Sequence, residues 1–179
     1  TIGESVPEDG RWPVQLAAAL RARGVPVAGP RIIATTGWTT DELSAAMDAA
    51  EPLGQWDFVS LLIGVNNQYR GRAVDDYRRE FAPLLGRAIA LAGGRPGRVL
   101  VLSIPDWGVT PFGRDSGRDT ARIAAELDAY NAAAAAECAA LGVAFVDITP
   151  ASRSPGHQPD RIAGDGLHPS APVSYTHLT

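Results

Sequence analysis

Short apolar runs alternate with longer helical stretches along this chain, and this alternation constrains the fold more than any other feature of the sequence. The runs are rich in Val, Ile, Leu and Phe, as buried strands are, and they span residues 31–34, 57–63, 98–103 and 143–147. The stretches between them carry apolar residues at helical spacing and span residues 12–23, 40–50, 75–92 and 118–141. Strands separated by helices are joined by crossovers, so the pattern predicts an α/β fold, a three-layer α/β/α sandwich with a parallel sheet.

The ends of the predicted elements carry recognisable signals. Residues 57–63 form a continuous apolar run, which is typical of a central strand covered on both faces. Thr39, Thr40 or Asp41 can cap the helix that precedes this strand, and Asp75 can cap the helix that follows it.

Composition indicates one ordinary globular domain, which we place at residues 1–172. The chain has 179 residues, 45% hydrophobic and 20% charged. The formal net charge is -4, and the basic residues are scattered, so we expect no nucleic-acid partner. No apolar run reaches the roughly 18 residues of a transmembrane helix. Nothing in the sequence sets the oligomeric state.

Cysteine and histidine usage gives no sign of a metal site or a cofactor. Cys138 is the single cysteine and lies in an Ala-rich helical stretch, so we expect a small core residue and not a nucleophile. One Cys and three scattered His cannot make a zinc site of the usual type. We therefore expect neither a metal nor a cofactor.

Both ends of the chain have unusual sequences. The chain opens with Thr1 and has no initiator Met, so the absence of a signal peptide says little about location. Residues 173–179 resemble one reading frame of a sequencing-library adaptor, and we expect a non-native tail; the alternative is a natural C-terminal tail. Ser174 and His177 are therefore left out of the chemistry.

Two predicted strands are followed directly by residues that can donate hydrogen bonds. In parallel sheets, ligands bind beyond the carboxyl ends of the strands. Gly37 follows the run at 31–34 and can present its N–H there, while Asn66 follows the run at 57–63 and offers an amide N–H₂. Each could instead be an ordinary turn residue.

An Asp-x-x-His sequence near the end of the chain could supply an acid/base pair. Asp165 stands three residues before His168, close enough in a tight turn to accept a hydrogen bond from one ring nitrogen. The other nitrogen would then be free to act as a base. His157 is the competitor, but it lies in a Pro/Gly-rich loop with only Asp160 beside it, so we expect a solvated side chain there.

Taken in this order, these motifs resemble the later conserved blocks of the SGNH/GDSL hydrolase family. The resemblance implies that Gly37 and Asn66 form an oxyanion hole, that Asp165 and His168 complete a Ser-His-Asp triad, and that the fold is flavodoxin-like. The family usually has Asp where Asn67 stands.

The Gly-Asp-Ser block of that family is absent from this chain. Thr1-Ile2-Gly3-Glu4 looks like the continuation of that block, cut just past its serine. We therefore expect a chain that lacks the nucleophile and the first strand and is inactive as it stands. Ser5 lies too far into the loop to substitute.

The resemblance predicts a serine esterase acting on carboxylic esters of small or lipid-like substrates. A non-catalytic flavodoxin-like binding domain and an inactive remnant are the alternatives. Trp12 is expected in the core, whereas Trp38 and Trp107 follow strands and could be either core residues or pocket walls.

Overall fold

The sheet at the centre of the molecule is parallel and three-stranded. The computed structural model describes residues 3–154 and 162–171. Its strands are β1 (Val59–Leu61), β2 (Val99–Leu102) and β3 (Ala144–Val146), in the order β1-β2-β3. Val59 lies opposite Val99, and Leu100 lies opposite Ala144. The predicted α/β class with a parallel sheet is confirmed.

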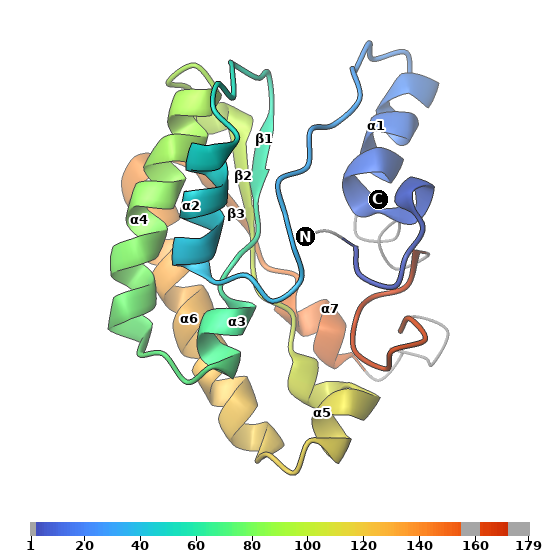
Figure 1. Cartoon of the computed structure of the whole chain (residues 1–179), viewed down its shortest axis with the longest axis vertical. Helices are drawn as coiled ribbons and strands as arrows, with labels where there is room; N and C mark the ends of the chain where they lie inside the picture. The colour runs from blue at the N-terminus through green and yellow to red at the C-terminus, as the bar shows by residue number, and fades with distance from the viewer. Residues whose placement is uncertain (1–2, 155–161, 172–179) are drawn as a thin grey trace.

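Helices precede, separate and follow the strands, and the longest of them match the stretches that the periodicity predicts. They are α1 (Trp12–Ala22), α2 (Thr40–Ala49), α3 (Val65–Tyr69), α4 (Val74–Leu91), α5 (Pro111–Asp115), α6 (Thr120–Leu141) and α7 (Thr149–Arg153). Short 3₁₀ turns occur at Glu8–Gly10, Pro96–Arg98 and Trp107–Val109. Helices α2, α4 and α6 lie on one side of the sheet and α1 on the other (Figure 1). Within the described ranges, no helix is long and apolar enough to span a membrane.

Two expectations about strands are wrong. Residues 31–34 are not a strand, and β1 is not central, because it pairs only with β2 within the described part of the chain. A strand exists only where a neighbour accepts and donates its backbone hydrogen bonds, and no described segment does so for residues 31–34 or for the outer edge of β1. Accordingly Phe58, at the start of the predicted run, is 50% exposed.

The starts of α2 and α4 illustrate how local signals set helix boundaries. Thr39 is the N-cap of α2, and its N–H donates to the Glu42 carboxylate at 2.8 Å, as in a capping box. The predicted cap of α4 is wrong, because Ala73 occupies the N-cap and Asp75 lies inside the first turn. A carboxylate in that turn is still favoured by the helix dipole.

The main core lies between the sheet and the pair α4/α6. The Tyr77 ring stacks on Tyr130 at 4.6 Å between centroids and also contacts Phe81. Cys138 on α6 is fully buried, and this burial raises the pKa of its thiol to about 11. A thiol in that environment stays protonated at neutral pH, which agrees with the expected core role.

The turn from β1 into α3 passes directly over this core. Gly64 is the N-cap of α3 and has φ of +125°, a conformation that residues with a side chain rarely adopt. A Cβ atom at this position would lie 2.6 Å from Cε2 of Tyr77 and 3.0 Å from Cδ1 of Ile104. The turn therefore requires glycine for both its backbone angle and its packing.

We expect Gly64→Ala to destabilise the protein by roughly 2–4 kcal/mol, the combined cost of backbone strain and overpacking. Gly71→Ala is the matched control, because Gly71 has φ of +71° but a Cβ atom there would have no neighbour within 4 Å. The control should show the strain cost alone, about 1–2 kcal/mol. Urea unfolding midpoints measure both, and equal losses would contradict the packing argument.

Candidate active site

Asp165 and His168 form a compact hydrogen-bonded turn near the end of the described chain. The Asp165 Oδ2 atom lies 2.7 Å from His168 Nδ1, while Oδ1 accepts from the backbone N–H groups of Leu167 and His168 at 2.9 Å each. The Leu167 side chain packs against the core and anchors the turn. A neutral His168 held in this way carries its proton on Nδ1, which leaves Nε2 free to accept one.

The hydrogen bonds around Asp165 also set its ionisation. Burial alone would raise the pKa of Asp165, but the amide donors of His168 and Leu167, the His168 ring and the Ser5 hydroxyl outweigh it. Together these donors hold the pKa of Asp165 well below its ordinary range. The carboxylate is therefore charged at neutral pH, as a group that orients and stabilises an imidazolium must be.

Ser5 contacts the pair at Asp165 and not at the free nitrogen of His168. Its Oγ donates to Asp165 Oδ2 at 2.8 Å, the same oxygen that faces His168 Nδ1. A nucleophilic serine would instead lie against the free Nε2 of the imidazole. The position of the Ser5 hydroxyl thus differs from that of a triad nucleophile.

Gly37 lies in the loop before α2 and Asn66 at the start of α3, and these two segments are bonded to each other. The Asn66 side-chain N–H₂ donates to the Trp38 carbonyl at 3.0 Å, and Arg70 donates to the Gly37 carbonyl at 2.7 Å. Gly37 has φ of +90°, and its N–H finds no acceptor among the residues that the structure describes. The second Asn66 amide proton remains after the bond to Trp38, so both residues have a donor to offer a ligand.

The N-terminal segment connects the Gly37 loop to the Asp165–His168 turn. Ser5 bonds to Asp165, and the neighbouring Glu4 carboxylate accepts from the Thr36 hydroxyl, one residue before Gly37. The segment runs beside the C-terminal loop in Figure 1. Segments distant in sequence are thereby linked around residues 4 and 5. The grouping of all the predicted site residues around one reacting atom stays a prediction.

The other residues that the sequence singled out are either packed in the core or lie outside the described residues. Trp107 is 5% exposed, and its Nε1 donates to Gln68 at 2.8 Å, so it is a core residue. Trp38 is partly buried against the same core. His157 and His177 lie outside the described residues. No group of His, Cys, Asp and Glu that could hold a metal occurs in residues 3–154 and 162–171.

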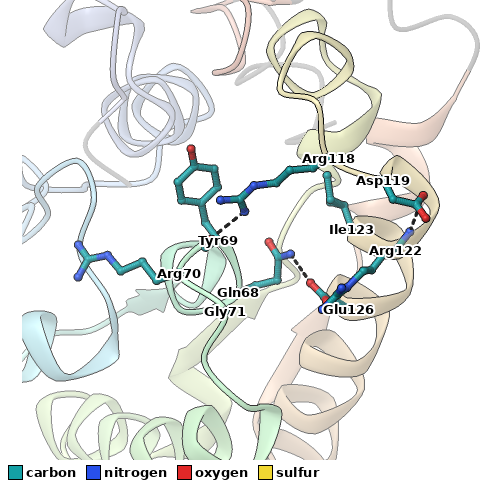
Figure 2. A pocket seen from close by; sticks show the side chains of 9 residues that line it. All are labelled: Gln68, Tyr69, Arg70, Gly71, Arg118, Asp119, Arg122, Ile123 and Glu126. Atoms are coloured by element: carbon teal, nitrogen blue, oxygen red, sulfur yellow. Dashed lines mark hydrogen bonds and ion pairs between the residues drawn. The ribbon is translucent and has the colours of Figure 1, made fainter.

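A pocket of about 440 Å³ lies beside the candidate site, between α3 and the start of α6 (Figure 2). Arg118 lies over the Tyr69 ring at 4.2 Å from its centroid, and Gln68 donates to Glu126 at the floor of the pocket. Asp165 and His168 are not among its lining residues. Some of its side chains already bond to one another, since Gln68 and Arg122 both donate to Glu126.

Sequence reasoning missed a buried polar cluster next to Asn66. Asn67 is fully buried, and its side chain bonds to Thr40 at the start of α2 and to Glu80 on α4. In the sequence, Asn67 stands out only as the residue found where the resembling family usually has Asp, and its partners could not be foreseen because they are 13 and 27 residues away.

Comparison with known proteins identifies one family that matches nearly the whole chain. The family described as GDSL-like Lipase/Acylhydrolase matches residues 1–172. No curated protein sequence matches the chain.

Several solved structures share the fold. TesA superposes with a TM-score of 0.71 at 19% identity, over 99% of this chain and 87% of TesA. The lipase/acylhydrolase from Enterococcus faecalis gives 0.68 at 19%, over 91% and 78%. A variant of Axe2, an acetyl-xylooligosaccharide esterase from a Geobacillus species, gives 0.68 at 20%, over 94% and 77%. At these identities the likeness establishes the fold alone.

The Asp165–His168 bond makes a prediction about proton placement. We expect neutral His168 to carry its proton on Nδ1, and we expect Asp165→Asn to move it to Nε2, because an amide N–H₂ would then face Nδ1. Imidazole ¹⁵N shifts distinguish the tautomers, with His168→Gln assigning the signal. Asp57→Asn, at an exposed carboxylate paired with Arg98, is the control that should leave the tautomer unchanged. An Nε2 proton in the unmutated protein would contradict this arrangement.

Proposed function

Because the chain belongs to the GDSL-like lipase/acylhydrolase family, whose members hydrolyse carboxylic esters, we propose that Asp165 and His168 are the acid/base pair of a serine esterase site. The observation that carries the proposal is the 2.7 Å contact between Asp165 Oδ2 and His168 Nδ1. In this role His168 Nε2 takes the proton of the attacking serine and later gives it to the leaving alcohol. Asp165 holds the ring and stabilises the imidazolium.

Gly37 and Asn66 are the proposed oxyanion donors. The Gly37 N–H and the second Asn66 amide proton support this role, because each is a donor without a described acceptor. As the serine attacks, negative charge develops on the carbonyl oxygen, and fixed donors stabilise it without reorganising. Arg70 contributes indirectly, because it holds the Gly37 carbonyl in the peptide unit that follows the donor N–H.

The nucleophile in this proposal is a serine preceding Thr1, on a strand that pairs with the outer edge of β1. The unpaired edge of β1 among the described residues supports this placement, as does the Ser5 hydroxyl on the acid side of His168. The proposed substrates are carboxylic esters of small or lipid-like molecules. Hydrolysis proceeds through an acyl-serine intermediate, which water releases with His168 as base.

We expect the 179-residue chain to form no adduct with an alkyl fluorophosphonate, because no described serine lies against His168 Nε2. A version extended by an apolar strand ending in Gly-Asp-Ser should be labelled at that serine, and His168→Gln should abolish the labelling. Intact-protein and peptide mass spectrometry read out both results. Labelling of the original chain that disappears in Ser5→Ala would overturn the assignment of the nucleophile.

In the extended protein, Asn66→Ala should lower kcat for short-chain p-nitrophenyl esters by roughly 10²–10³, the usual cost of one oxyanion donor. KM should change little, because the donor acts on the transition state. Gln68→Ala, in the neighbouring pocket, is the comparison variant and should leave kcat within about threefold. A rise in KM with unchanged kcat would make Asn66 a substrate-binding group instead.

A further inference from the structure

Asn67 is a buried amide in direct contact with a carboxylate, and it has no chemical role in the proposed reaction. Its side chain is fully buried, and its Oδ1 accepts from the Thr40 N–H at 3.1 Å. Its Nδ2 donates to Thr40 Oγ1 at 2.7 Å and to Glu80 Oε2 at 3.4 Å. The Thr40 hydroxyl in turn donates to Glu80. One amide thus joins the starts of α2 and α3 to α4.

The cluster is placed next to both candidate oxyanion donors. Asn66 and Asn67 are consecutive residues of α3, and their side chains bond to Trp38 and Thr40 respectively. The segment that they hold begins directly after Gly37. Any shift of Thr40 relative to Asn67 would therefore change the spacing between the Gly37 N–H and the Asn66 amide.

We propose that Asn67 and Glu80 act as positioning residues, an amide–carboxylate clamp that fixes the distance between the two oxyanion donors. This inference rests on the proposed function for the identity of the donors. The clamp itself is defined by geometry. It needs a hydrogen-bond donor at position 67, because the carboxylate of Glu80 faces that side chain.

Charge makes the clamp testable by exchange of its members. Asn67→Asp has nearly the same shape but places a second carboxylate against Glu80. Adding Glu80→Gln restores an amide–carboxylate pair with its members exchanged. A role in packing alone predicts no effect of the first change and no rescue by the second.

The sign of the pH dependence follows from the same contact. In the Asn67→Asp variant, the new carboxylate and Glu80 would repel each other most strongly when both are charged, so the stability loss is full at neutral pH and shrinks on acidification. The charged and titratable groups around Glu80 are Arg72, Arg79, Asp41, Asp76 and Tyr130. They are common to all variants, and burial raises the pKa of Tyr130 to about 12, outside the range tested.

The first experiment uses the 179-residue chain and follows thermal midpoints at pH 7 and pH 5, with amide hydrogen exchange at Thr40. We expect N67D to lower the midpoint by roughly 5 °C at pH 7 and by less at pH 5, and to speed Thr40 exchange about tenfold. N67D/E80Q should return both values close to those of E80Q. Asn131→Asp is the matched control, because Asn131 bonds to Ile104 and Thr149, and E80Q should not rescue it.

The second experiment measures kcat and KM in the version extended by Gly-Asp-Ser. N67D should lower kcat about tenfold with KM nearly unchanged, and N67D/E80Q should recover most of the loss. If N67D does not fold, recovery of folded protein in N67D/E80Q supports the clamp, and no recovery overturns it. The clamp is also overturned if the stability loss of N67D does not depend on pH, or if E80Q does not restore the stability. It is overturned as well if kcat does not recover together with stability in N67D/E80Q.

These outcomes separate the clamp from the proposed function. If Asn66→Ala leaves kcat unchanged while stability and Thr40 exchange follow the expected rescue, the assignment of the oxyanion donors fails and the clamp remains as a structural pair. If Asn66→Ala lowers kcat but N67D is not rescued by E80Q, the proposed function stands and the clamp fails.

Discussion

The ring of Tyr77 lies where α4, α6 and the turn after β1 meet, and each of these elements depends on it. Tyr77 is 1% exposed and its ring stacks on Tyr130, while its hydroxyl donates to the carbonyl of Ile63, two residues after the end of β1. Gly64 crosses its edge so closely that no larger residue fits. Aromatic packing of this kind is strong and directional, so it fixes where α3 starts and hence where Asn66 lies.

The polar contacts of the candidate site follow from that placement. Once α3 starts over Tyr77, Asn66 and Asn67 lie on the turn that faces the start of α2 and hold Trp38 and Thr40. A buried amide is costly unless its donors and acceptor are satisfied, so these bonds resist local displacement. The other half of the site combines local and distant contacts, since the Asp165–His168 turn has hydrogen bonds within a few residues and is also bonded to Ser5.

Local patterns predicted much of the fold and the chemistry of the turn. The long helices and the parallel class followed from periodicity, and the Asp165–His168 bond followed from a spacing of three residues, because all of these depend on near neighbours. The edge position of β1 and the lack of a strand at residues 31–34 did not follow, since strand formation depends on a partner elsewhere in the chain. The cap of α4 at Ala73 was missed because a carboxylate suits the first turn as well as the cap.

The sequence by itself determined that this chain alternates helices with parallel strands, that Cys138 belongs to the core, and that an aspartate can orient His168. Only the tertiary structure decided that Ser5 bonds to Asp165, that Trp107 is buried, and that Asn67 joins Thr40 to Glu80. The physical reason is the distance along the chain over which each interaction acts. Periodicity and capping act within a few residues, whereas a buried hydrogen bond between distant segments exists only after packing has excluded water and brought its members together.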